Sequence, residues 1–467
     1  MSKGDKGIVK KTGLYFIGNF ASKITMAAMI PFYAYFVTVE ELGVFDYSQT
    51  IMYTVSPVIF VALWESILRF LLAETDIEKR QNVIATSIRT IQIIMFILLA
   101  TIVATAIWSD NKIAMYTILM VCVYGIAQIW QYYARALKFN HIYVMASIWG
   151  TVLNFAISIV MICFLKMGGT GLFWSFIIGQ STIVIIIEFK LRILKYNRIG
   201  NFKWHILKHM LIFSIPLVLN LASNWIISGF GRIIITNKLG TYDNGLFSFA
   251  MKFGTVVSML GTVISMALIE ESIIKSKDEG IDKYFSKVIE IVFKLFLFIC
   301  ILAIPFIKLF YYFISGTEYF STYNLVPFFL VYAIFMTMAT NIGAIFQAKS
   351  KTNMLFYTTV IGAFVTISLA LLMINKLGVL GVLFAQIVGA LSMLVFRWLL
   401  AKKMIKLVVK WDKIIYLTAI YLIVVVICSK DFAFSIFIGL LASLFALYVN
   451  KDLIRDLKNF NNNKQVR

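Results

Sequence analysis

The sequence predicts an all-α integral membrane protein with about fourteen transmembrane helices. Hydrophobic residues make up 61% of the 467 residues, charged residues 14%, and the mean hydropathy is +0.89. A soluble domain is nearer half apolar and a quarter charged. The apolar residues are gathered in runs long enough to cross roughly 30 Å of hydrocarbon. Since lipid offers no partner to backbone N–H and C=O groups, these runs must be helices.

The apolar segments predict two six-helix bundles followed by two further helices. They cover 12–36, 47–71, 84–108, 113–133, 142–165, 171–190, 209–236, 245–269, 288–314, 322–346, 353–375, 379–401, 414–429 and 432–450. We expect an N-terminal bundle over 1–200 and a C-terminal bundle over 201–408, with the boundary in the basic loop 190–208. Residues 409–467 then hold the two extra helices and a cytoplasmic tail.

Positive charge is distributed unevenly between the loops. Alternate polar stretches, beginning with the N-terminus and including Arg397–Lys413, hold 32 of the 43 Lys and Arg residues, whereas the intervening stretches hold five. This positive-inside asymmetry predicts that both termini are cytoplasmic. The net charge of +21 therefore reflects topology and contact with anionic lipid, and we expect no nucleic-acid partner.

Three short motifs recur in the two halves at nearly constant offset. They are Asn19–Ser22 with Asn220–Ser223, Gly43–Phe45 with Gly245–Phe247, and the K-x-G-x-x-G-x₇-G pattern of Lys166–Gly179 with that of Lys376–Gly389. The offset spans six segments, an even number, so the copies enter the membrane in the same direction. Parallel repeats related by an axis along the membrane normal are a transporter architecture, with substrate bound at the repeat interface.

Charged side chains within the membrane are candidate site residues because they are costly to bury there. Lys23 lies about 11 residues into the first segment, or roughly 17 Å deep. Asn19 shares its helix face at a spacing of four residues. We expect both to face a central cavity.

A polar stripe runs along the seventh segment, where Asn220, Asn224, Ser228 and Arg232 stand four residues apart. Lys252 follows in the eighth segment. We expect these residues to contribute to substrate binding. The alternative interpretation is structural: Arg232 and Lys252 snorkel to headgroups, and the Asn residues bond neighbouring helices.

Glu65 and Arg69, four residues apart at the end of the second segment, are candidates for gating or for a local ion pair near the cytoplasmic surface. The cysteines lie inside apolar segments without metal-ligand spacing, and the histidines lie in or beside polar loops. We therefore expect no catalytic residue, no metal and no cofactor.

Several of these stretches resemble the Wzx-type oligosaccharide flippases, a branch of the superfamily that also holds multidrug and toxin extruders and peptidoglycan-precursor flippases. The matching stretches are Leu14–Lys23, Pro31–Tyr33, Glu40–Asp46, Phe213–Leu217, Arg232–Ile235 and Gly245–Ser248. The sequence departs from many relatives at Gly231, where they have an acidic residue, which puts acid-mediated coupling at this position in doubt.

The resemblance implies two bundles facing each other in a V around a cationic cavity. It also implies a flippase in the bacterial cytoplasmic membrane that moves undecaprenyl-pyrophosphate-linked oligosaccharide by alternating access for surface polysaccharide biosynthesis. The partners would be the lipid-linked oligosaccharide, membrane lipids, a polysaccharide polymerase and glycosyltransferases.

Four other functions compete with this interpretation. A lipid II-type flippase or a multidrug/cation antiporter belongs to the same superfamily, but an antiporter requires intramembrane acids, and apart from Glu65, Glu270 and Glu271 the segments are acid-poor. A membrane glycosyltransferase or polymerase requires a large outer loop, which the sequence lacks. A scaffold without transport activity would leave the mid-membrane Lys23 unexplained.

Overall fold

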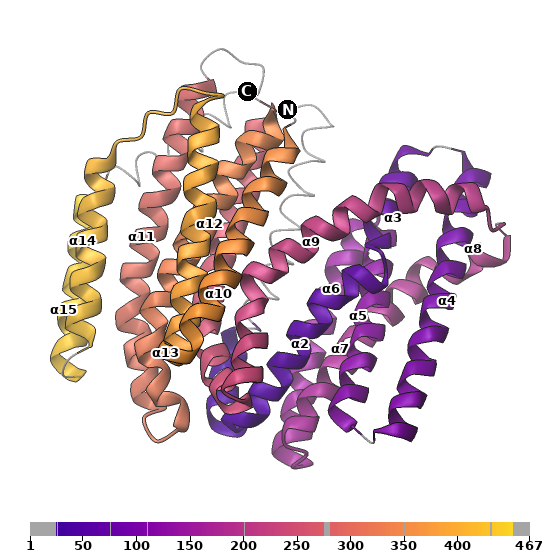
Figure 1. Cartoon of the computed structure of the whole chain (residues 1–467), viewed down its shortest axis with the longest axis horizontal. Helices are drawn as coiled ribbons and strands as arrows, with labels where there is room; N and C mark the ends of the chain where they lie inside the picture. Colours follow the sequence, from indigo (N-terminus) through magenta and orange to yellow (C-terminus); the bar gives the residue numbers. More distant parts are fainter. Residues whose placement is uncertain are drawn as a thin grey trace. The chain divides into compact units, whose positions relative to one another are not determined.

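A computed structural model describes residues 25, 27–74, 76–109, 111–199, 201–274, 281–349, 351–429 and 432–451 (Figure 1). Helices make up nearly all of these residues, and none of them forms a β-strand. The chain divides into two compact units, Met1–Gly245 and Leu246–Arg467. The predicted all-helical fold class is confirmed.

The first unit is built from long helices connected by short turns. The helix Ala27–Phe36 covers the described end of the predicted segment 12–36, whose first part lies outside the described residues. The helices that follow are α2 (Val39–Ile59), α3 (Leu63–Ala73), α4 (Ile77–Trp108), α5 (Lys112–Ala136), α6 (Asn140–Ile159) with the π-helical turn η1 (Val160–Phe164), α7 (Gly169–Leu191), α8 (Ile193–Ile199) and α9 (Trp204–Lys238). Within this unit α7 packs against both α5 and α6, and α9 packs against α2, α3 and α4. Polar caps begin several helices, as at Asp76, whose side chain accepts the Glu78 and Lys79 amides before α4.

The second unit follows α10 (Thr241–Ile274), which begins in the first. It holds α11 (Ile281–Phe313), the 3₁₀ segment η3 (Glu318–Leu325), α12 (Val326–Ala348), α13 (Thr352–Lys402), α14 (Trp411–Cys428) and α15 (Phe432–Val449). Helix α11 packs against α12, α14 and α15. The last two predicted segments are therefore helices that join the second unit.

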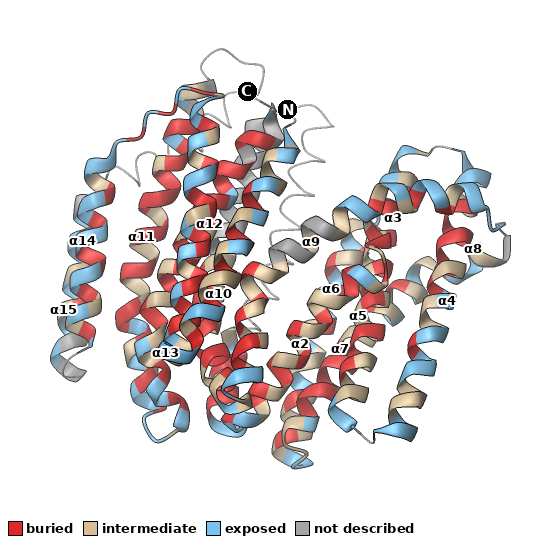
Figure 2. Ribbon diagram, viewed as in Figure 1, coloured by how far each residue is buried: buried red, intermediate tan, exposed pale blue. Residues whose placement is uncertain are grey.

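Apolar surface identifies a multi-pass membrane protein. Among the described residues, eight helices are long and apolar enough to cross a bilayer, or nine when the bent pair α2 and α3 counts as one span. In the most apolar window of α4 only 11% of the residues are buried inside the protein, and Figure 2 shows exposed residues along this helix. Such a surface needs a lipid environment. The number of fourteen crossings remains a prediction.

The predicted segment 47–71 is broken into α2 and α3, which meet at an angle of 50°. The backbone of Val61 and Ala62 is left-handed at the break, with φ of 48° and 44°, a conformation that costs a residue with a side chain about 1–2 kcal/mol. The buried Phe60 fills the space beside Gly125, where an added Cβ would lie 2.1 Å from the ring. The break follows Pro57 in the last turn of α2, because a proline inside a helix removes a backbone hydrogen bond and favours a kink.

The glycines of the repeated K-x-G-x-x-G-x₇-G pattern have the same local roles in both units. Gly168 has φ 55° and ψ −141°, and Gly378 has φ 55° and ψ −135°, a region that is practically closed to other residues. Each marks the turn of a helical hairpin. Helix α13 is thus a hairpin of two limbs, which correspond to the predicted segments 353–375 and 379–401.

The last glycine of each pattern lies where the two limbs cross. A Cβ on Gly179 would lie 2.8 Å from the Gly150 carbonyl oxygen, and a Cβ on Gly389 would lie 2.9 Å from that of Gly362. The limbs can approach this closely because neither glycine has a side chain. The sequence repeat therefore corresponds to a repeated local structure. The rotation axis along the membrane normal that should relate the two copies remains a prediction.

The compact units divide later in the chain than the predicted boundary in the loop 190–208. Helix α9 begins beyond this loop yet packs against α2, α3 and α4, so it joins the first unit. The boundary by packing lies after Gly245. The start of the second copy in the loop 190–208 remains a prediction from the sequence repeat, whereas the contacts group α9 with the first unit.

Candidate functional site

The start of α2 places an acidic residue inside the first unit. Thr38 and Glu41 form a capping box: the Thr38 hydroxyl accepts the Glu41 amide at 3.3 Å, and Glu41 Oε2 accepts the Thr38 amide at 3.1 Å. The helix therefore begins at Val39. Asp46 lies two turns into it, with only 5% of its side chain exposed.

Asp46 pairs with Arg232 of α9. Arg232 Nε lies 3.1 Å from Asp46 Oδ2, and Arg232 Nη1 donates a hydrogen bond to Thr50 Oγ1 at 3.1 Å. The contact at Nε is electrostatic rather than an aligned hydrogen bond. Gly229, one turn before Arg232, lets α9 approach α2, because a Cβ there would lie 3.0 Å from Thr50 Cγ2. With 14% of its side chain exposed, Arg232 is a mostly buried cation.

Aromatic rings continue this site along the same two helices. Tyr53, on the α2 face that carries Asp46 and Thr50, stacks on Trp225 of α9 with ring centroids 4.5 Å apart and an interplanar angle of 2°. Tyr124 of α5 meets Tyr53 edge-on at 5.2 Å. We call Asp46, Thr50, Tyr53, Trp225 and Arg232 the α2–α9 cluster. It presents charges and partly exposed rings, the groups that bind anions and sugars.

The other predicted binding residues are not brought together by the described contacts. Asn19 and Lys23 lie outside the described residues, and so do the side chains of Asn220 and Asn224 on α9. Lys252 belongs to α10 in the second unit and is partly buried. Among the predicted binding residues, Arg232 is therefore the one that the structure describes in the α2–α9 cluster.

Glu65 and Arg69 have separate partners rather than each other. Tyr132 donates a hydrogen bond to Glu65 Oε1 at 2.8 Å, while the Arg69 guanidinium lies 4.2 Å above the centre of the Phe213 ring. Arg69 thus forms a cation–π contact between α3 and α9. Glu65 therefore contacts α5 and Arg69 contacts α9, both within the first unit.

Asp46 is a site residue that the apolar pattern does not indicate, because it precedes the predicted segment 47–71. The helices therefore contain a buried acid in addition to Glu65, Glu270 and Glu271. The capping pattern Thr38-x-x-Glu41 could have revealed Asp46, since it starts the helix at Val39. Arg397 was likewise counted in a basic loop, but it is buried within α13.

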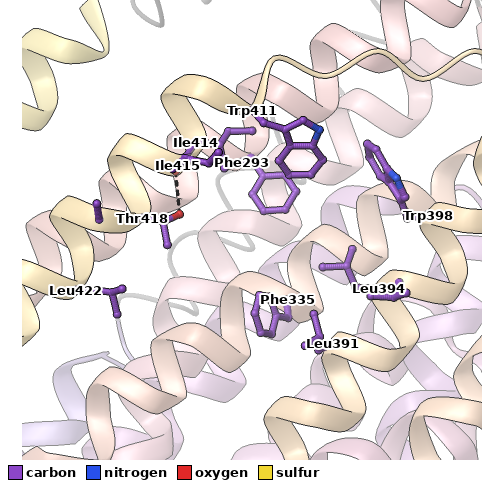
Figure 3. Close-up of a pocket in the computed structure, with 12 residues that line it drawn as sticks. Phe293, Phe335, Leu391, Leu394, Trp398, Trp411, Ile414, Ile415, Thr418 and Leu422 are labelled. Atoms are coloured by element: carbon purple, nitrogen blue, oxygen red, sulfur yellow. Dashed lines mark hydrogen bonds between the residues drawn. The ribbon is translucent and has the colours of Figure 1, made fainter.

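A second feature, an apolar pocket, lies in the second unit beside α14. Its volume is about 590 Å³, and Figure 3 shows Trp398, Trp411, Phe293 and Phe335 among the side chains around it. These come from α11, α12, α13 and α14. The lining is almost wholly apolar, and the Thr418 hydroxyl donates to the Ile414 carbonyl at 2.8 Å. The pocket therefore suits a hydrocarbon chain rather than a polar group.

Comparison with known proteins identifies the family. Residues 88–322, just over half of the chain, match the model of a family described as polysaccharide biosynthesis protein. The chain belongs to this family. The resemblance to Wzx-type flippases that the sequence indicates is thereby confirmed. No curated protein matches the sequence.

Solved transporters share the fold at low sequence identity. The chain is similar to the lipid II flippase MurJ in an inward closed conformation, with a TM-score of 0.72 and 14% identity over 96% of this chain and 100% of that one. It is also similar to an inward-facing multidrug resistance MATE transporter of the MOP superfamily, with a TM-score of 0.63 and 15% identity over 87% and 96%. A MATE structure in complex with MaL6 matches at a TM-score of 0.61 and 14% identity, over 88% and 97%. The chain therefore has the fold of MOP-superfamily transporters.

Proposed function

We propose that this protein flips undecaprenyl-pyrophosphate-linked oligosaccharide across the bacterial cytoplasmic membrane by alternating access. The observation that carries the proposal is a mostly buried cation, Arg232, in a membrane protein of the polysaccharide biosynthesis family. A pyrophosphate and polar sugars cannot cross hydrocarbon unaided. A protected cation inside the membrane lowers the cost of bringing in the anion.

In this mechanism the lipid pyrophosphate replaces Asp46 as the partner of Arg232. The ion pair keeps the guanidinium neutralised when substrate is absent, because an isolated buried charge is costly. A phosphate binds a guanidinium through charge-assisted hydrogen bonds. The neighbouring rings of Tyr53 and Trp225 offer apolar faces to sugar rings.

Substitution of Arg232 tests this function by complementation of a polysaccharide-export defect. Losing one charge-assisted contact costs about 1.5–3 kcal/mol, or roughly 10- to 150-fold in binding. Arg232→Ala also leaves the buried Asp46 unpaired, so export is measured per amount of protein in the membrane. On this measure Arg232→Ala should impair export, and Arg232→Lys should impair it less. The control is Lys238→Ala, which removes an exposed cation at the end of the same helix. Full export by Arg232→Ala would contradict the proposal.

The remaining predicted residues, Lys23, Lys252, Asn19, Asn220 and Asn224, are proposed as further contacts to the same substrate. Lys23 should hold the second phosphate, with the asparagines hydrogen-bonding to sugars. Under this proposal the double variant Lys23→Ala/Arg232→Ala exports less than either single variant at equal abundance. Export equal to the wild type would assign both cations a structural role.

The apolar pocket beside α14 is proposed to hold part of the prenyl chain. Ala419 lines it, so Ala419→Phe should fill the space and reduce export. Ile423→Phe is the matched control, since Ile423 is exposed but does not line the pocket. Equal export by both variants would exclude the pocket from the transport path.

Asp46 supports a second candidate function, a cation-coupled antiporter. A buried carboxylate can carry a proton or bind a sodium ion. An antiporter would protect cells against cationic dyes, and Asp46→Asn would abolish that protection. Dye resistance without any effect on polysaccharide export would favour this function over the flippase.

The charge asymmetry of the loops supports a topology with both termini in the cytoplasm, where glycosyltransferases make the substrate. A reporter fused after Arg467 that is active only outside the cytoplasm should stay silent. Reporter activity would overturn this orientation.

A further inference from the structure

A polar pocket in the first unit lies apart from the α2–α9 cluster, at the start of α4 and α9. Its volume is about 330 Å³, and the lining residues are Phe70, Glu74, Lys79, Asn82, Val83, Lys203, His205, Ile206 and His209. It thus gathers two lysines and two histidines around one acid. Phe70, Val83 and Ile206 supply an apolar part of the wall.

The loop before α9 is fixed against α4 by two hydrogen bonds. The Asn201 amide donates to Asn82 Oδ1 at 2.7 Å, and the Lys203 amide donates to Thr86 Oγ1 at 3.0 Å. Asn82 and Thr86 are buried on α4. These bonds hold Lys203 and the first turn of α9 at the pocket. The backbone that carries Lys203 is therefore fixed beside α4.

Two features within the pocket favour an anion. Helix α9 has no side-chain cap at Lys203, and the free amides of a helix N-terminus attract negative charge. Asn82 is 8% exposed, and its amide nitrogen donates to no described residue. Asn82 lines the pocket, so this donor can form a hydrogen bond to a ligand oxygen there.

The charge balance of the pocket is positive. Glu74 is already engaged, because its Oε1 accepts the Asp76 amide at 3.1 Å beside the start of α4. His209 Nδ1 contacts the His205 carbonyl oxygen at 2.6 Å. A carbonyl only accepts, so Nδ1 is the donor in this contact. The positive charge of the pocket therefore comes from Lys79 and Lys203.

The surroundings indicate a membrane surface. Trp204 and Ile77, at the first residues of α9 and α4, are 66% and 74% exposed, and both helices continue into apolar sequence. Tryptophan is enriched at the level of lipid headgroups. A ligand in this pocket would contact the lysines with an anionic group and the apolar wall with a hydrocarbon chain.

From this geometry we propose that the pocket between the starts of α4 and α9 binds the phosphate group of an anionic phospholipid. Lys79 and Lys203 pair with the phosphate, Asn82 and the α9 N-terminus donate to its oxygens, and the acyl chains follow the apolar surface. The site is independent of the proposed function, because it uses none of the α2–α9 cluster.

The test is lipid retention by the purified full chain in nanodiscs of phosphatidylcholine with phosphatidylglycerol, measured by native mass spectrometry. Since each lysine near an anionic surface contributes about 5-fold to binding, Lys79→Gln/Lys203→Gln should weaken phosphatidylglycerol retention about 30-fold. Ile206→Trp keeps all charges but narrows the pocket, and should also reduce retention.

The control pair is Lys195→Gln/Lys208→Gln, which removes two exposed lysines from the same region outside the pocket. Equal losses in the two pairs would mean diffuse surface charge and overturn the proposal. A second arm adds inorganic phosphate to protein in phosphatidylcholine alone. Saturable phosphate binding without selective lipid retention would assign the pocket to a free anion and overturn the lipid assignment.

Discussion

The hairpin α6–α7 of the first unit and the hairpin α13 of the second share their backbone geometry but differ in their charges. Gly168 and Gly378 have nearly the same φ and ψ. Yet only the first of these turns is described with a carboxylate beside it: Glu41 Oε1 accepts the Gly169 amide at 2.7 Å. Because a hairpin turn constrains the backbone sterically, its glycine positions recur, whereas charged partners depend on neighbouring helices and diverge.

Buried charges show the same divergence. In the first unit Arg232 faces the carboxylate of Asp46. In the second, the buried Arg397 donates to neutral acceptors: the hydroxyls of Thr358 and Thr359 at 3.1 and 3.0 Å, and the Ala339 carbonyl at 2.8 Å. Among the described residues, Arg232 has a partner of opposite charge and Arg397 does not. The first arrangement can exchange its partner for a substrate anion, whereas the second connects α12 to the two limbs of α13.

The largest expected effect is on the ion pair. Asp46→Ala removes the carboxylate from a mostly buried guanidinium, so it should destabilise the protein by about 3–5 kcal/mol. Asp46→Leu/Arg232→Met replaces both charges by apolar groups and should recover most of this loss. Thermal unfolding in detergent measures both. A double variant as unstable as Asp46→Ala would show that the pair does not account for the effect.

A smaller difference in stability is expected between Gly→Ala variants at the two hairpin turns. A side chain in this backbone region costs about 1–3 kcal/mol, which applies to Gly378→Ala and Gly168→Ala alike. At Gly168 the new Cβ would also lie 2.3 Å from Glu41 Oε1, so the bond to the Gly169 amide is lost, at about 1–2 kcal/mol more. Unfolding temperatures should rank Gly168→Ala below Gly378→Ala. Equal temperatures would mean that Glu41 does not stabilise the turn.

The crossings of the two limbs in α6–α7 and in α13 should respond differently to a second substitution that makes room for an added side chain. Overpacking at a crossing costs about 1–3 kcal/mol. In Gly389→Ala the nearest atom is Thr366 Oγ1 at 1.9 Å, and in Gly179→Ala it is Asn154 Cβ at 2.7 Å. Thr366→Ala should therefore partly restore the stability of Gly389→Ala, whereas Asn154→Ala, which keeps its Cβ, should not restore Gly179→Ala. Rescue in both hairpins would contradict the geometry at Asn154.

The smallest effect is expected at Arg397. The Thr358 and Thr359 hydroxyls already donate to main-chain carbonyls of α13, so removing the guanidinium leaves them bonded. Arg397→Met removes a buried charge, which is costly to desolvate, together with its hydrogen bonds, and should change stability by less than about 1.5 kcal/mol. Unfolding in detergent checks this value. A loss as large as that of Asp46→Ala would mean that the two cations are equivalent.

The sequence by itself determined the membrane class, many of the helical segments and the repeated glycine motif, because these depend on local properties. A long apolar run must be a helix in lipid, and a glycine at a sharp turn is required by the backbone at that residue. Thr38 and Glu41 likewise fix the start of α2 through a local capping box.

Only the tertiary structure decided which residues of the first unit form the α2–α9 cluster. Asp46 and Arg232 lie far apart in the chain, and no periodicity connects them. Their contact depends on α9 packing against α2, which Gly229 permits beside Thr50. Arg397 shows the same limit, since its position near the end of a segment is typical of a loop cation until packing buries it. Hydropathy reports the environment of a helix as a whole, whereas the partner of a single charge is determined by the helix that packs against it.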